Sequence, residues 1–337
     1  MEKVLSIIIP TYNMENYLNR CLDSLIVDNM DLLEVLVIND GSKDRSSEIA
    51  HTYSQRYPGT FKVIDKENGN YGSCINRGLK EATGKYVKIL DADDSFNTEN
   101  FRDYLNKIKD LDVDLILTDF ITIDENEKVI NTSNYNIPKS SIQDFYHEFQ
   151  NERIGFQINM HAVTYKRQNL IDIKYKQTEG ISYTDMEWVY TPMTTVNKGI
   201  YYDMPIYKYL IGRPGQTMDA NIRKKQISQL MKMAGSLAER FEANTRQEYC
   251  HYLKFMAISQ IKQIYEQGLL DKYYDIKLLR EFDNRLKSTS MELYKEIDKI
   301  RKCKIRYVYY WRNHKFSELP IHIHILFKIR DFLSYIL

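Results

Sequence analysis

Three carboxylates fall within four positions, at Asp91, Asp93 and Asp94, directly after the short apolar run 86–90. Like charges this close repel one another, so a buried group of them needs a compensating cation. Carboxylate oxygens are the ligands that hard divalent cations such as Mg²⁺ prefer. A metal held there commonly serves a phosphorylated substrate. The spacing therefore predicts a divalent metal site among these carboxylates, at the end of a strand.

Polar residues also follow two other apolar runs. Residues 11–13 come after the run 4–9, and Asp40 comes after the run 35–38. The carboxyl ends of neighbouring parallel strands meet at one edge of a sheet, where open α/β sheets bind their ligands. We therefore expect these polar residues to gather beside Asp91 and Asp93.

The elements that would position these groups follow from the apolar pattern. Five apolar runs have the length and composition of strands buried on both faces, namely 4–9, 35–38, 61–64, 86–90 and 115–118. Three stretches between them repeat apolar residues at helical spacing, namely 18–26, 44–53 and 73–82. This alternation predicts an α/β fold with a doubly wound, mainly parallel sheet. The pattern beyond residue 219 is helical, so we expect two domains, 1–218 and 219–337.

The bulk composition is that of a soluble globular protein. The chain has 337 residues, of which 43% are hydrophobic and 28% charged, and its net charge of +1 gives no argument for nucleic acid. Its four cysteines are far apart, which fits a reducing cytosol and no zinc site. The first ten residues do not have the pattern of a signal peptide, and no apolar stretch approaches the length of a membrane span. We expect a cytoplasmic location.

Four segments in this order resemble an inverting glycosyltransferase of family 2 with the Rossmann-like GT-A fold, of the bacterial surface-polysaccharide type. They are residues 6–13 (SIIIPTYN), 37–44 (VINDGSKD), 68–72 (NGNYG) and 91–94 (DADD). Each motif alone is weak, but their order and their positions at strand ends agree. The resemblance covers roughly the first two-thirds of the chain and implies a catalytic domain over residues 1–218.

The resemblance implies roles for the matching positions. Tyr12 would lie against the nucleotide base, and Asp40 would accept a hydrogen bond from the base's ring N–H, which favours uracil. Asp93 would bind Mn²⁺ or Mg²⁺ on the diphosphate, with Asp91 near the ribose and the metal's water shell. Relatives carry an Arg-Asn pair after the glycine loop, which this chain replaces by Asn-Arg. The residues expected to contact the nucleotide-sugar are Pro10, Thr11, Tyr12, Asp40, Asn76, Arg77, Asp91, Ala92 and Arg213.

The acceptor hydroxyl must lose a proton as it attacks, so a carboxylate base is needed on the opposite face of the sugar. Asp185 is the best candidate, because relatives show Glu-Asp where this chain has Thr184-Asp185. Glu187 is its rival. Thr184 is a residue type that caps the helix which Asp185 would open. His161 would either reach the acceptor or the metal or be a structural histidine, and the structural interpretation is favoured.

Two segments allow two interpretations each. Residues 211–217 (IGRPGQT) would form either a lid that brings Arg213 to the diphosphate or an ordinary linker. The segment 301–337 has 8 Lys+Arg against 2 Asp+Glu, and aromatic residues are interleaved with the cations, among them Tyr307, Tyr309, Tyr310, Trp311, Phe327 and Phe332. It would either make peripheral contact with an anionic membrane surface, or pack on its own protein or on a second subunit of a homo-oligomer.

Together these features predict a metal-dependent inverting glycosyltransferase. It would move a sugar from a nucleotide-sugar, expected to be UDP-linked, to a hydroxyl of a glycan or lipid-linked acceptor in cell-surface polysaccharide synthesis. One alternative is a haloacid-dehalogenase-type phosphoryl-transfer enzyme, whose DxDx motif normally follows the first strand. Another is a non-catalytic nucleotide-sugar-binding protein.

Overall fold

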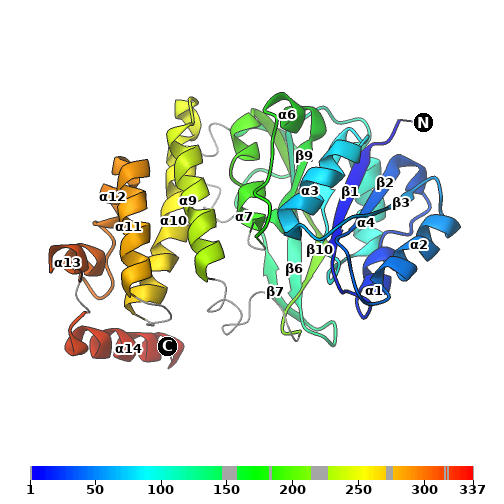
Figure 1. Ribbon diagram of the computed structural model, residues 1–337. Coiled ribbons are helices and arrows are strands. Elements are labelled where there is room, and N and C mark those ends of the chain that lie inside the picture. The colour runs from blue at the N-terminus through cyan, green and yellow to red at the C-terminus, as the bar shows by residue number, and fades with distance from the viewer. Residues whose placement is uncertain are drawn as a thin grey trace. The chain divides into compact units, whose positions relative to one another are not determined.

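The computed structural model describes residues 2–145, 158–181, 184–213, 227–270, 276–314, 316 and 319–336. The chain divides into two compact units, residues 1–216 and 217–337 (Figure 1). The boundary expected from the sequence, between residues 218 and 219, lies outside the described residues, as does the part of the expected lid beyond Arg213.

A ten-stranded sheet forms the centre of the N-terminal unit. Its main path has the order β3-β2-β1-β4-β9-β6-β10-β5, while β7 pairs with β6 and β8 pairs with β10. The strands are β1 Leu5–Thr11, β2 Leu33–Asn39, β3 Phe61–Asp65, β4 Tyr86–Ile89, β5 Ser95–Phe96, β6 Leu115–Ile123, β7 Val129–Ser133, β8 Ile142–Asp144, β9 Val163–Lys166 and β10 Lys198–Leu210. Strand β1 runs parallel to β2 and β4, and β10 runs parallel to β6. The predicted mainly parallel α/β sheet is confirmed.

Helices cover the sheet because its central strands are apolar on both faces. Residues 5–9 of β1 are all buried. The helices of this unit are α1 Leu18–Asp23, α2 Ser46–Arg56, α3 Asn70–Glu81, α4 Thr98–Ile108, α6 Arg167–Asp172 and α7 Asp185–Trp188. Figure 1 shows α3 alongside β1, and the two elements are in contact. Gly78 makes this approach possible, because a Cβ there would lie 2.5 Å from Cγ2 of Ile8.

Helix α3 begins earlier than the sequence predicts. The expected helix 73–82 starts at Asn70 instead. The carboxylate of Asp40 accepts hydrogen bonds from the backbone N–H groups of Gly69 and Asn70, each at 2.9 Å. These are donors of the kind that a helix start leaves without partners inside the helix. The acceptor comes from the end of a distant strand, so the local sequence does not show it.

The C-terminal unit is helical, as predicted. Its helices are α9 Ile227–Glu242, α10 Cys250–Leu269, α11 Ile276–Thr289, α12 Met291–Ile297, α13 Tyr307–Asn313 and α14 Ile321–Ile336. The buried guanidinium of Arg312 joins four of them. It pairs with Asp283 of α11 at 2.6 Å and with Asp298 after α12 at 2.9 Å, and it donates to the hydroxyl of Tyr265 on α10. No helix in the described part of the chain is both long and apolar enough to cross a membrane.

Candidate functional site

The predicted site residues Thr11, Asp40 and Asp91 lie at or just beyond the carboxyl ends of β1, β2 and β4. Strand β1 lies between the other two, and Thr11 is in register with Asn39, the residue before Asp40. The parallel arrangement therefore places all three on one edge of the sheet, as expected.

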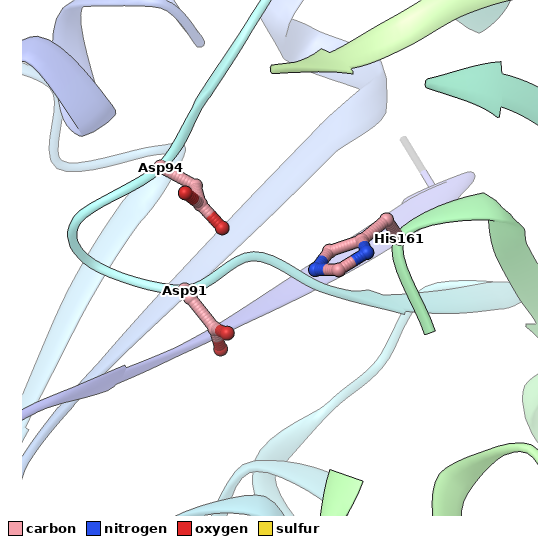
Figure 2. A group of neighbouring side chains, drawn as sticks. All are labelled: Asp91, Asp94 and His161. Atoms are coloured by element: carbon pink, nitrogen blue, oxygen red, sulfur yellow. The ribbon is translucent and has the colours of Figure 1, made fainter. Parts of the chain in front are cut away.

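Asp91, Asp94 and His161 lie together at this edge (Figure 2). One potential ligand atom from each lies within 4.8 Å of the others. The hydroxyl of Tyr71 donates to Asp91 at 2.8 Å, while burial and the charge of Asp93 raise the pKa of Asp91 to about 7. Burial and the charges of Asp93 and Asp91 also raise the pKa of Asp94. A cation between these groups would relieve the repulsion.

Asp94 is held rigidly in this group. Its carboxylate accepts hydrogen bonds from the hydroxyl of Tyr207 and the backbone N–H of Leu210, each at 2.7 Å. The Tyr207 oxygen in turn accepts from the backbone N–H of Asp91 at 3.1 Å. Strand β10 therefore fixes the carboxylate of Asp94 and the backbone of Asp91.

The His161 ring is packed among aromatic side chains, with ring centroids 4.4 Å from Tyr209 and 4.7 Å from Tyr207. Burial, with a smaller effect of the Lys88 charge, lowers the pKa of His161 to about 3. The imidazole is therefore neutral, which is the form that binds metals. Its Nδ1 is buried and has no hydrogen-bond partner among the described residues.

Lys88 fixes the backbone that carries His161. Its buried ammonium donates to the carbonyl oxygens of His161 at 2.7 Å and Val163 at 3.2 Å. Burial lowers the pKa of Lys88 to about 7. Two carboxylates and a neutral imidazole form a donor set that suits Mn²⁺. For Mg²⁺, which prefers oxygen ligands, the two carboxylates are the suitable part of this set. The residues present therefore fit a divalent cation.

Asp93, the expected metal ligand, has a different partner in this structure. Its carboxylate forms an ion pair with Nε of Arg213 at 2.5 Å, and both side chains are nearly buried. The guanidinium of Arg213 also lies over the ring of Tyr17, 5.5 Å from its centroid. The structure thus brings Arg213 to the carboxylates. It also adds Arg20, whose guanidinium donates to the backbone oxygen of Asp93 at 2.6 Å.

The residues expected to bind the nucleotide differ in their exposure. Tyr12 has 47% of its surface exposed, whereas Thr11 is buried and donates through its hydroxyl to the carbonyl of Ile9. Pro10 is partly buried and Ala92 is buried. The carboxylate of Asp40 already accepts three hydrogen bonds from its own chain, since Lys66 also donates to it, at 2.5 Å. A base contact at Asp40 would use the acceptor site left on Oδ2 or replace one of these donors.

Asn76 and Arg77 have partners in different parts of the unit. The Asn76 side-chain amide donates to the carbonyl of Gln177 at 2.9 Å and accepts from its N–H at 2.8 Å. It therefore holds the segment that leads to Asp185. Arg77 is exposed and pairs with Glu81 at 3.1 Å on the same helix. The structure does not bring Arg77 to the carboxylate group.

Asp185 is exposed at the start of α7. Burial is the main cause of the raised pKa values of Asp91 and Tyr71, and the charge of Asp185 adds a smaller part to each. Glu187 is fully buried, and its two oxygens accept from the N–H and the hydroxyl of Thr178, each at 2.7 Å. Glu187 therefore stabilises the backbone at Thr178, while Asp185 is exposed to solvent.

The expected cap at Thr184 is wrong. Thr184 occupies the position before α7, but its side chain makes no capping hydrogen bond. Its hydroxyl is buried without a hydrogen-bond partner among the described residues. The Gln177 side chain instead donates to the Thr184 carbonyl. Ser182 and Tyr183, within the segment that carries the proposed base, lie outside the described residues.

A family model matches the part of the chain that contains this edge of the sheet. Residues 6–171 match the model of glycosyl transferase family 2. These residues are a family 2 glycosyltransferase domain. The match contains the polar ends of β1, β2 and β4 and also His161, whereas Asp185 and Arg213 lie beyond it. It does not favour the phosphoryl-transfer alternative.

Individual relatives agree with the family 2 assignment. The chain is 34% identical over 116 residues to the Bacillus subtilis "Uncharacterized glycosyltransferase EpsJ", covering 34% of this chain and 33% of that protein. It is 28% identical over 212 residues to the Escherichia coli "Uncharacterized glycosyltransferase YibD", covering 61% of each. The chain thus spans less than two thirds of the length of either relative.

A solved structure shows the same fold over most of the chain. Residues 1–349 of S. aureus TarS, crystallised in complex with UDP-GlcNAc, give a TM-score of 0.66 at 19% identity, covering 93% of this chain and 88% of that chain. The likeness supports the GT-A fold that the sequence predicts, followed by a helical region.

Proposed function

We propose that this chain is a metal-dependent inverting glycosyltransferase. It transfers a sugar from a UDP-sugar to a hydroxyl of a glycan or lipid-linked acceptor in cell-surface polysaccharide synthesis, acting in the cytoplasm. The observation that carries the proposal is the grouping of Asp91, Asp94 and His161 at the carboxyl edge of the sheet, in a family 2 domain. UDP is proposed because the TarS structure, of the same fold, holds UDP-GlcNAc.

Asp91, Asp94 and His161 would hold Mn²⁺ or Mg²⁺, with Asp93 available once Arg213 leaves it. A divalent cation bound there neutralises the charge that develops on a diphosphate leaving group. Arg213 carries the group best suited to an anionic phosphate. Because its present partner is the Asp93 carboxylate, the guanidinium can exchange that anion for the diphosphate when a donor binds.

Asp185 is the proposed base. It takes the proton of the acceptor hydroxyl while that oxygen attacks the anomeric carbon. The bond from the anomeric carbon to the diphosphate oxygen breaks, and its electron pair leaves with UDP. This single displacement inverts the anomeric centre. Glu187 is not favoured as the base, because both of its oxygens are engaged by Thr178 in the interior.

The test is UDP release from a panel of UDP-sugars with Mn²⁺ and a mixture of candidate glycan and lipid-linked acceptors. Asp185→Asn should lose turnover by at least about a hundredfold and retain UDP binding, since general-base catalysis contributes about 10²–10⁴-fold. Asp110→Asn, at an exposed residue after α4, is the matched control. Full turnover in Asp185→Asn would remove Asp185 as the base. Failure of wild type to bind any UDP-sugar would overturn the proposal itself.

A further inference from the structure

Helix α14 exposes an apolar stripe that the proposed reaction does not use. Ile321, Ile325 and Ile329 have 77%, 52% and 53% of their surfaces exposed. Residues four apart lie on one face of a helix, so these three side chains form a continuous line. Leu326, 42% exposed, widens it. Isolated exposed apolar residues are ordinary on protein surfaces, but a continuous line of them marks an interaction site.

The opposite face of α14 already has its packing partners. Ile323 and Phe327 are buried, and the Phe327 ring lies 6.2 Å from that of Tyr307 on α13. The ammonium of Lys302 lies 5.6 Å from the same Phe327 ring. The helix is therefore seated on its own unit through one face. The isoleucine stripe is a second apolar face, and the fold of this unit does not require it.

Cations predominate in the segment that carries the stripe. Residues 301–337 contain eight Lys+Arg and two acidic residues, Glu318 and Asp331. Among these cations, Arg312 belongs to the buried ion-pair network described above. Arg301, Lys304 and Arg330 are exposed. Between residues 319 and 330 the sequence has no Asp or Glu at all.

An apolar stripe in cationic surroundings fits an anionic lipid surface best. Helices of this kind lie in the plane of the interface, with the apolar face at the boundary between headgroups and acyl chains. Exposed Lys and Arg then lie near lipid phosphates, each adding attraction that salt screens. Pairing of the stripe with a second copy of this chain would place cations against cations, which is repulsive.

We propose that α14 docks the C-terminal unit on an anionic membrane surface. Ile321, Ile325 and Ile329 enter the headgroup boundary, and Arg330 with the exposed cations of residues 301–304 contacts the lipid phosphates. This docking is independent of the metal and nucleotide site, because no residue of that site takes part in it. It would hold the enzyme at the surface where a lipid-linked acceptor lies.

The test is co-sedimentation of the full chain with vesicles of phosphatidylcholine, with and without about one-third phosphatidylglycerol. Wild type should bind the anionic vesicles at low salt and lose binding at high salt or on pure phosphatidylcholine. Serine at positions 321, 325 and 329 together should weaken binding by about tenfold or more, because the apolar term is removed. The matched control places serine at Val129, Ile130 and Ile142, which are 51%, 55% and 55% exposed in the other unit, and should bind like wild type.

Three results would overturn the proposal: wild type staying in solution with anionic vesicles, equal binding to neutral vesicles, or undiminished binding of the α14 triple variant. A dimer seen by sedimentation velocity that the triple variant loses, without vesicle binding, would assign the stripe to a second copy instead. UDP release in solution should be the same for wild type and the triple variant. Loss of docking with activity retained therefore separates this proposal from the proposed function.

Discussion

Gly72 of α3 lies directly against Thr178, in the segment leading to Asp185. A Cβ at Gly72 would lie 2.9 Å from the carbonyl carbon of Thr178 and closer still to its oxygen. The Thr178 segment cannot simply move away, because Asn76 holds Gln177 by two hydrogen bonds and Glu187 holds Thr178 by two more. Replacing Gly72 by alanine therefore forces either a strained contact or a displaced segment.

The size of the effect follows from these contacts. Overpacking of a buried contact costs about 1–3 kcal/mol. Relief by movement would instead break the two Asn76–Gln177 hydrogen bonds, each contributing about 1 kcal/mol. We expect Gly72→Ala to lower the free energy of unfolding of the N-terminal unit by about 2–3 kcal/mol. The displacement would reach Asp185, so kcat should fall by about tenfold or more, with the KM for the donor little changed.

Urea unfolding measures the stability loss. The chain has two tryptophans, Trp188 and Trp311, so a Trp311→Phe background leaves Trp188 to monitor the N-terminal unit. Gly59→Ala in the same background is the control, because a Cβ at Gly59 meets nothing within 4 Å. If Gly72→Ala unfolds at the same urea concentration as its parent, with the same kcat, the close approach has no role in placing Asp185.

Three further predictions concern buried or paired charges. Arg312→Met leaves the buried carboxylate of Asp283 without its partner and should cost the C-terminal unit about 3–5 kcal/mol, and an unchanged melting temperature would contradict this. Arg213→Ala should raise the KM for the donor by about tenfold, because a charge-assisted hydrogen bond to phosphate contributes about 1.5–3 kcal/mol, and an unchanged KM would leave Arg213 as a structural partner of Asp93. Burial lowers the pKa of Lys88 from 10.5 to about 7, so the unfolded state binds more protons between these values and stability should rise with pH across this window. Lys88→Met should lack this rise in urea titrations, and parallel pH profiles for the two proteins would refute the shifted pKa.

The sequence predicts the buried parallel strands well and the later strands poorly. Strand β1 is a continuous apolar run, and its burial on both faces follows from composition alone. Strand β10 instead mixes tyrosines with charged residues and contains Pro205, where its pairing with β6 shifts register. Strand β9 enters antiparallel between β4 and β6, a placement set by tertiary pairing that no local pattern shows.

The candidate site divides in the same way. Thr11, Asp40 and Asp91 could be grouped from the sequence, because they follow strands whose parallel order brings their ends together. His161 could not, since a single histidine 70 residues beyond Asp91 has no spacing that relates it to a carboxylate motif. The role of Lys88 could not be predicted either, because a lysine within an apolar run does not indicate which carbonyl oxygens its ammonium will contact.

Electron spin echo spectroscopy of Mn²⁺ bound to the full chain with UDP tests the central claim most directly. Wild type should show coupling of the metal to an imidazole nitrogen, and His161→Gln should abolish that coupling and weaken Mn²⁺ binding by about tenfold or more. Asp185→Asn should keep both signals, because Asp185 acts on the acceptor. Wild-type Mn²⁺ without nitrogen coupling, bound as tightly by His161→Gln, would contradict the grouping of Asp91, Asp94 and His161 as the metal site.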